Sequence, residues 1–181
     1  MLLYRLQQLT NNFNRLRALF LILLPLTFTA CQQEGVSAAT QDTQSLAGAG
    51  RGLQVFKDPT CGCCELWIDH VNERGFAAQI NHPENLALEK LKIGVPPIYQ
   101  SCHTSVSEQG YFFEGHVPAK IIQRFLDAPP TYAVGLAVPG MPMGSPGMEI
   151  GDQFQPYEVL VINADGTAEV YATIKTKEEQ Y

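Results

Sequence analysis

The sequence is short of basic residues, of long apolar stretches and of methionine. It contains 12 lysines and arginines against 18 acidic residues, which gives a formal net charge of −6. This acidic balance argues against a nucleic-acid partner and would tolerate a cationic one. The apolar run at residues 18–30 has 13 residues, with threonine as its only polar residue. It is too short to span a bilayer comfortably, because a transmembrane helix needs about 20 residues.

The first 30 residues have the layout of a secretory signal. Residues 1–17 contain three arginines and no acidic residue, and the apolar run follows directly. A basic flank followed by a short apolar core is typical of an export signal that is removed from the mature protein. We therefore predict a signal peptide of lipoprotein type at residues 1–30.

Cys31 ends this run in a context that resembles a bacterial lipobox, Leu26–Cys31. In lipoproteins the corresponding cysteine becomes the lipid-bearing first residue of the mature chain. Phe28 stands where leucine is usual, so ordinary signal cleavage nearby is the alternative. Gln32, rather than aspartate, after the cysteine favours the outer membrane. We therefore expect the protein in the periplasm, anchored to the outer membrane through lipidated Cys31.

Without residues 1–30 the chain keeps 151 residues, and its formal charge becomes −9 because only three arginines are lost. This length suits one domain with one core. Residues 31–52 are rich in Ser, Ala, Thr, Gln and Gly and predict a flexible tether. The folded domain is expected at residues 53–181.

Apolar periodicity and turn residues predict an α/β domain in which strands and helices alternate. Residues 131–156, rich in Gly, Pro and Met, show neither helical nor strand periodicity and are expected to form a long loop. Asn163–Gly166 is a strong signal for a hairpin turn. The expected strands are 53–56, 76–80, 98–102, 111–114, 157–162 and 167–174, and the expected helices are 61–74, 83–91 and 118–127.

This order resembles the thioredoxin fold over about residues 53–127, with the loop and the C-terminal β-hairpin as additions. The resemblance depends on Cys61-x-x-Cys64 after the first strand and on Val95-Pro96, which corresponds to the cis-proline segment that faces the thiols in that fold. A cis X–Pro bond is a minority state, found in about one of twenty such bonds in folded proteins. It is therefore a specific expectation here.

Three thiols stand within four residues at Cys61-Gly62-Cys63-Cys64, where a helix is expected to start. Free backbone N–H groups and the helix dipole favour a thiolate at that place, which serves both attack on a disulfide and coordination of a metal. With Cys102 the mature chain has four cysteines. This even number is compatible with two disulfides, with one disulfide and two ligands, or with an all-thiolate metal site. A Cys61–Cys64 disulfide with Cys63 buried is one of the alternatives.

Further candidate ligands lie later in the chain. Cys102 ends the predicted strand after the proline turn, near the expected helix start. Its neighbour His103 should face the other side of a strand, so we expect a surface or loop residue. His116 lies at a strand-to-helix junction, where Gly115 could turn its imidazole towards the thiols. Imidazole is a common partner of thiolates on soft metals, so His116 is a candidate ligand.

Apart from Met1, all methionines of the sequence lie in the predicted Gly/Pro/Met loop: Met141, Met143 and Met148. Methionine in a core is normally dispersed over helices and strands. Thioether together with thiolate suits Cu(I), whereas zinc prefers thiolate and imidazole. The loop either supplies ligands or covers the thiols as an apolar lid.

Four motifs in order are similar to one known family. They are Cys-Gly-Cys-Cys-x-x-Trp at 61–67, Ser-Cys-His-Thr at 101–104, Glu-Gly-His-Val-Pro at 114–118 and Val-Pro-Gly-Met-Pro-Met-Gly-Ser-Pro-Gly-Met at 138–148. The set resembles the CopG-type family of periplasmic copper-resistance proteins, long known as a domain of unknown function. The resemblance implies a thioredoxin-like fold that binds copper through cysteine and histidine and cycles it between Cu(I) and Cu(II). The implied cysteine ligands are Cys61, Cys63, Cys64 and Cys102, with His116 as the imidazole.

The leading hypothesis is thus a periplasmic copper-binding protein for metal resistance, in which bridging thiolates hold more than one Cu(I). A periplasmic protein that loads or unloads the copper is a possible partner. The alternative is a thiol–disulfide oxidoreductase in which Cys61 attacks and Cys64 resolves. A structural lipoprotein with two inert disulfides is the third hypothesis. No catalytic residue is assigned under the copper-binding hypothesis.

Overall fold

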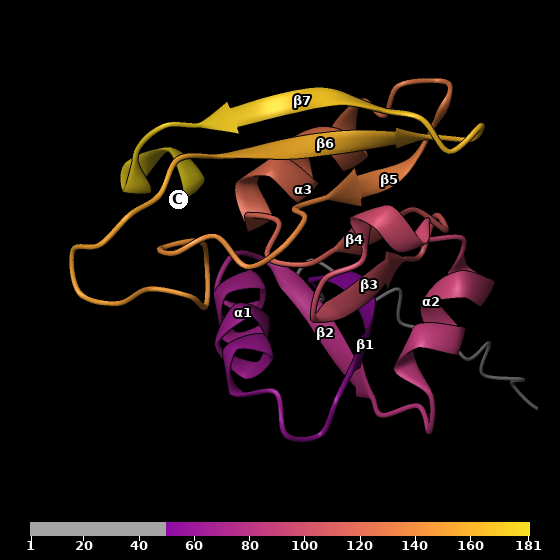
Figure 1. Cartoon of the computed structure of the whole chain (residues 1–181), viewed down its shortest axis with the longest axis horizontal. Helices are drawn as coiled ribbons and strands as arrows, with labels where there is room; N and C mark the ends of the chain where they lie inside the picture. The colour runs from indigo at the N-terminus through magenta and orange to yellow at the C-terminus, as the bar shows by residue number, and fades with distance from the viewer. Residues whose placement is uncertain (1–49) are drawn as a thin grey trace, which may run out of the picture. The chain divides into compact units, whose positions relative to one another are not determined.

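The structure, a computed structural model, describes residues 50–181 (Figure 1). The predicted signal peptide, the lipidation site Cys31 and residues 31–49 of the predicted tether lie outside the described residues. Within 50–181, none of the helices has the length and apolar character that crossing a membrane requires.

The described residues form a mixed α/β domain built on one seven-stranded sheet. The strands are β1 (Arg51–Lys57), β2 (Phe76–Asn81), β3 (His103–Ser107), β4 (Phe112–Glu114), β5 (Ala133–Ala137), β6 (Tyr157–Asn163) and β7 (Ala168–Ile174). The helices are α1 (Gly62–Asn72), α2 (Leu86–Ile93) and α3 (Ala119–Asp127), with the short 3₁₀ helices η1 (Pro97–Tyr99) and η2 (Lys177–Gln180).

The strand order in the sheet is β2-β1-β3-β4-β5-β6-β7. β1 and β2 are parallel and are connected through α1, whereas β3 runs antiparallel to both β1 and β4. β5 pairs parallel with β4, and β6 and β7 continue the sheet as an antiparallel hairpin. The C-terminal third of the domain therefore extends the sheet made by the first two thirds (Figure 1).

Helices cover both faces of this sheet. Neighbouring strand residues point to opposite faces, and Phe113 and Phe112 accordingly belong to different clusters. Phe113 packs in the larger cluster with Trp67 of α1 and Phe125 of α3, whereas Phe112 packs with Val95 after α2. Figure 1 shows α1 and α2 on opposite sides of β1 and β3. The thiol helix therefore lies on the face with the larger core.

The predicted loop at 131–156 is wrong in its first part, because residues 133–137 form β5 between β4 and β6. The strand has the sequence Ala-Val-Gly-Leu-Ala, whose small residues hide the alternation that marks a half-buried strand. Gly135 lies directly against Phe112, where a Cβ atom would collide with the backbone of that residue. Close packing of β4 and β5 thus explains why Gly135 is present, although glycine in the sequence suggested a loop at this position.

The predicted strand at 98–102 and the cis bond at Val95-Pro96 are also wrong. All peptide bonds in the described part of the chain are trans. Pro96 has φ −64° and ψ 137°, and Pro97 opens the 3₁₀ helix η1. Two successive prolines fix φ and remove two backbone donors, which suits a short turn better than a strand. β3 consequently begins only at His103.

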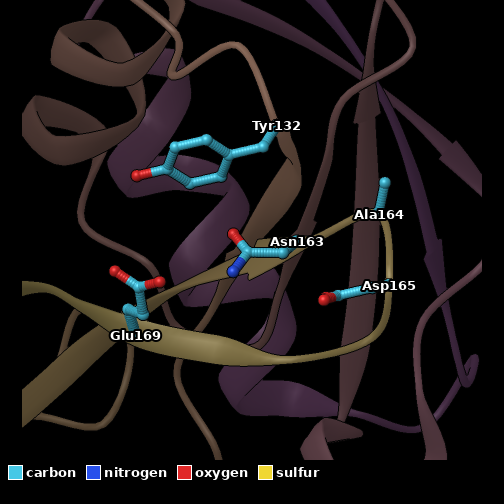
Figure 2. A pocket seen from close by; sticks show the side chains of 5 residues that line it. All are labelled: Tyr132, Asn163, Ala164, Asp165 and Glu169. Carbon is cyan, nitrogen blue, oxygen red and sulfur yellow. The ribbon is translucent and has the colours of Figure 1, made fainter.

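A pocket of about 410 Å³ lies beside the turn between β6 and β7 (Figure 2). No cysteine, histidine or methionine is among the residues that line it. They are Tyr132, Asn163, Ala164, Asp165 and Glu169.

Candidate metal centre

The cysteines stand at the start of α1 because a tight turn follows β1. The backbone N–H and the hydroxyl of Thr60 donate to the Asp58 carboxylate at 2.8 and 2.6 Å, and the Cys61 N–H donates to the Asp58 carbonyl at 3.1 Å. Cys61 is the N-cap residue of the helix. The fully buried Lys57 ammonium binds the Asp58 carbonyl at 2.9 Å and the Glu65 carboxylate at 2.7 Å, which ties the turn to the helix. The thiols are thus held at the helix N-terminus, as the sequence predicted.

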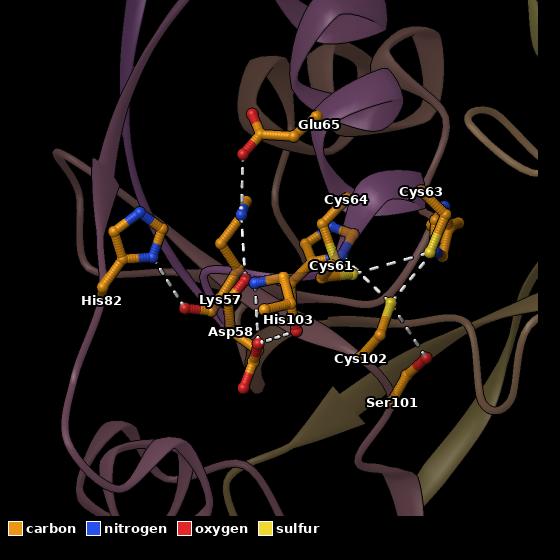
Figure 3. The surroundings of a disulfide bond; sticks show 12 residues. Lys57, Asp58, Cys61, Cys63, Cys64, Glu65, His82, Ser101, Cys102 and His103 are labelled. Carbon is orange, nitrogen blue, oxygen red and sulfur yellow. Dashed lines mark hydrogen bonds and ion pairs between the residues drawn. A yellow bond between two sulfur atoms is a disulfide. The ribbon is translucent and has the colours of Figure 1, made fainter.

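Cys61 and Cys64 form a disulfide, with their Cα atoms 5.4 Å apart (Figure 3). Cys64 is buried, and Cys63 is a free, half-buried thiol whose sulfur lies 3.6 Å from the Cys61 sulfur. Of the pairings that the cysteine count allowed, the structure therefore shows one disulfide and two free thiols. The two paired sulfurs become thiolate donors only after reduction.

Cys102 completes a group of four sulfur atoms. It lies in the bend before β3, and its sulfur and those of Cys61, Cys63 and Cys64 all lie within 4.8 Å of one another. β3 pairs with β1, with His103 opposite Lys57, so the start of β3 lies beside the thiol turn. Strand pairing thus brings together sulfurs that are about 40 residues apart in the sequence (Figure 3).

Cys102 also belongs to a second group, with His103 and His116, whose donor atoms likewise lie within 4.8 Å of one another. The Cys102 sulfur is 3.0 Å from Nε2 of His116 and 3.3 Å from Nδ1 of His103. Nδ1 of His116 lies 2.7 Å from the Pro146 carbonyl, which only accepts hydrogen bonds. This contact assigns the proton to Nδ1 and leaves the lone pair of Nε2 facing the sulfur.

The position expected for His103 is wrong. The side chain is fully buried, with its ring centroid 4.3 Å from Trp67 and 5.1 Å from His116. Opposite orientation of neighbouring residues holds only inside a strand, and here Cys102 lies in a bend while His103 opens β3. Both side chains can therefore reach one site. The motif Ser-Cys-His-Thr could have indicated that His103 belongs to the site. The wrongly predicted strand at 98–102 instead implied that the His103 side chain faces away from that of Cys102.

Burial decides the protonation of this group. It lowers the pKa of His116, although the Pro146 carbonyl opposes that shift, and it holds the pKa of His103 well below the usual range. Burial, with the nearby Cys63 thiol, raises the pKa of Cys102 to about 11. Both imidazoles are therefore neutral at neutral pH, and the Cys102 thiol keeps its proton until a metal displaces it.

The Gly/Pro/Met loop lies against the thiol helix through its backbone. Gly147 has φ +84°, and a Cβ there would come within 2.6 Å of the Cys63 carbonyl and 2.7 Å of the Trp67 backbone nitrogen. Met141 and Met143 are 55% and 39% exposed, and Met148 is half-buried. The loop thus covers the first turn of α1 with glycine and proline, and it positions His116 through Pro146.

These donors fit a soft metal ion. Thiolate and neutral imidazole are ligands for Cu(I) and for zinc, and the buried His103 adds a further nitrogen to the group of Cys102 and His116. A thiolate shared by two donor groups can bridge two ions. Two further features of this site were not predicted from the sequence: the buried Lys90–Glu114 ion pair and the Pro146 carbonyl that binds His116. Glu114 does, however, fall within the motif that contains His116.

Comparisons with known proteins relate the chain to proteins named for copper resistance. A family model described as "Protein of unknown function, DUF411" matches residues 99–148. A solved structure named "Copper resistance protein copG- Form 1" is 41% identical, covers 69% of this chain and 98% of its own, and has a TM-score of 0.65. "Form 2" of the same name is 40% identical, with coverage of 70% and 99% and a TM-score of 0.66. No curated protein matches the chain.

Proposed function

Because the chain belongs to the CopG-type family of copper-resistance proteins, we propose that it binds copper, with more than one Cu(I) held by its thiolates and imidazoles. The observation that carries this proposal is the place of Cys102 in both donor groups. Its thiolate can bridge an ion among the sulfurs of α1 and an ion beside His103 and His116. Copper supplies a one-electron Cu(I)/Cu(II) couple when bound, and the role proposed is copper resistance through binding or redox handling.

The Cys61–Cys64 disulfide makes this capacity depend on the redox state of the protein. Reduction by an external dithiol, which itself becomes a disulfide, transfers two electrons and two protons and frees both thiols. The reduced protein then offers four sulfurs, and the oxidised protein offers only Cys63 and Cys102. Met141, Met143 and Met148 remain proposed additional ligands.

The strand order β2-β1-β3-β4, with β1 and β2 parallel and β3 antiparallel, supports the proposed thioredoxin-like arrangement of residues 53–127. The periplasmic location and the lipid anchor at Cys31 are proposed from the basic flank, the apolar run and the lipobox-like stretch. A periplasmic copper-transfer partner is proposed with them.

The test is anaerobic loading of the reduced protein with Cu(I), followed by measurement of the copper-to-protein ratio and the X-ray absorption edge. We expect more than one copper per chain in the wild type and a clear loss in Cys61→Ser/Cys102→Ser. His82→Gln, outside both donor groups, is the matched control and should bind as the wild type does. Less than one copper per chain, or an unchanged ratio in the double variant, would contradict the proposal.

A thiol–disulfide oxidoreductase is the second candidate function, because the structure contains the Cys61–Cys64 disulfide that such an enzyme uses. The Cys61 thiolate would attack a substrate disulfide, and Cys64 would release the product thiol by re-forming the protein disulfide. The single variant Cys102→Ser, which keeps the Cys61–Cys64 pair, separates the two candidates in a disulfide-reductase assay on metal-free protein. Robust turnover that survives Cys102→Ser would favour the enzyme.

A further inference from the structure

A buried ion pair lies next to the donor group of Cys102, His103 and His116. The Lys90 ammonium is 2.5 Å from the Glu114 carboxylate, and the two side chains are 3% and 0% exposed. Lys90 comes from α2, and Glu114 ends β4. Burying two charges costs desolvation energy that their attraction often does not return. A contribution to stability therefore does not by itself explain why this ion pair is present.

The pair holds both ends of the segment that contains Cys102 and His103. At one end, the Ser101 N–H donates to Glu114 Oε1 at 2.5 Å, and the Lys90 ammonium donates to the Ser101 carbonyl at 2.5 Å. At the other end, the Thr104 hydroxyl donates to Glu114 Oε2. One carboxylate thus spans Ser101–Thr104 and fixes the two donors between them.

Glu114 is also close in sequence to His116, the third donor of this group. Glu114 is two positions before His116, and the intervening Gly115 donates its N–H to the His103 carbonyl at 2.9 Å. Gly115 has φ +72°, and a Cβ there would come within 2.6 Å of the Val138 carbonyl and 2.9 Å of Ser101 Cβ. The Glu114–His116 turn therefore lies in close contact with the Ser101–His103 segment.

We propose that Lys90 and Glu114 are positioning residues, which hold Cys102, His103 and His116 in the arrangement that binds copper. This inference rests on the proposed function, because it assigns a task in that site. Groups that orient metal ligands typically contribute 10- to 100-fold in metal affinity. A pair that serves only the fold would instead affect both donor groups through global stability.

The test compares Glu114→Gln and the double variant Lys90→Met/Glu114→Gln with the wild type, all reduced and loaded with Cu(I). The double variant leaves no unpaired buried charge, since replacing both members of a buried pair is often tolerated. Glu89→Gln is the matched control, because Glu89 pairs with Lys92 on the same helix at 3.0 Å but at the surface. The readouts are Cu(I) affinity by chelator competition, thermal stability, and the nitrogen and sulfur ligand numbers from X-ray absorption.

We expect both Glu114 variants to bind Cu(I) 10- to 100-fold more weakly, with loss of nitrogen ligands while the sulfurs of α1 keep part of the copper. Glu89→Gln should match the wild type. A folded double variant with wild-type affinity and ligand numbers overturns the inference. If neither Glu114 variant folds, Thr104→Val removes only the hydroxyl contact, and unchanged affinity and nitrogen number in that variant overturn it equally. A wild type that binds no copper refutes the proposed function instead.

Discussion

At the residue scale, His103 is the feature that needs a chemical explanation. The side chain is fully buried, and its Nε2 has no hydrogen-bond partner within the described residues. An unpaired buried polar atom costs about 1–3 kcal/mol, and an apolar ring would avoid that cost. Its Nδ1 lies 3.3 Å from the Cys102 sulfur, inside the second donor group. The unpaired atom and the contact with Cys102 therefore favour a role for His103 in the proposed copper site rather than in folding.

Replacing this histidine separates the two roles. In His103→Phe the ring keeps its packing against Trp67 but loses both nitrogens. We expect the thermal midpoint of the copper-free protein to stay at or above the wild-type value, because the unpaired atom is gone. Cu(I) affinity, measured by chelator competition, should fall about 10-fold or more. His82→Phe is the control outside both donor groups. A large loss of stability with unchanged affinity would show that His103 is structural.

At the scale of elements, the loop between β5 and β6 matters through its backbone. It reaches the first turn of α1 at Gly147, next to Cys63 and Trp67, and its Pro146 carbonyl fixes the tautomer of His116. The Gln180 side chain of η2 donates to the Gly144 carbonyl at 2.7 Å, and this buried contact holds the loop from the other side. The loop is thus a packed cover of the thiol turn.

A pair of alanine substitutions tests this cover. Gly147 and Gly140 both have positive φ, +84° and +72°, so alanine strains the backbone at both positions. Only at Gly147 does the new Cβ also meet α1, whereas nothing lies within 4 Å of it at Gly140. We expect Gly147→Ala to lose about 1–3 kcal/mol more stability than Gly140→Ala. Its Cys63 should also be alkylated faster, measured on copper-free protein by mass spectrometry. Equal behaviour of the two variants would contradict a packed cover.

At the scale of the whole molecule, His70 connects α1 to α3. Its Nε2 accepts a hydrogen bond from the Ala119 N–H at 3.1 Å, and burial, with Arg74 nearby, lowers the pKa of His70 to about 3. This contact requires a neutral imidazole. Protonation of His70 in acid therefore removes this contact between α1 and α3, the two helices that pack on the larger core.

This linkage predicts a loss of stability in acid. Between pH 6.5, the ordinary pKa, and about 3, the unfolded chain binds a proton at His70 that the folded chain does not. The free energy of unfolding should therefore fall as the pH falls through this window, by at most about 1.4 kcal/mol per pH unit for this group. His70→Gln can keep the hydrogen bond without titrating, so its profile should be flatter. Denaturant unfolding at several pH values measures both. Identical slopes would exclude His70 as a source of the acid sensitivity.

The sequence predicted more of the fold near strong local signals than elsewhere. The thiol helix, β2 and the β6–β7 hairpin follow from apolar periodicity and from the Asp165-Gly166 turn, and all three are present. β5 was missed because Gly135 is required by contact with Phe112 rather than by a turn. The segment from Pro96 to Cys102 was misread because turn geometry overrides an apolar composition. Each error concerns a place where contacts distant in sequence decide the backbone.

By itself the sequence determined the kinds of donor atom, because three closely spaced thiols, a fourth cysteine and a histidine in family motifs need no coordinates to be recognised. Only the tertiary structure decided how they group. The pairing of β3 with β1 brings Cys102 to the thiol turn, and the bend before β3 turns His103 inward. Pro146 directs the lone pair of His116, and the Lys90–Glu114 pair holds the segments together. A sequence names ligands, whereas their distances depend on strand pairing and on buried polar contacts.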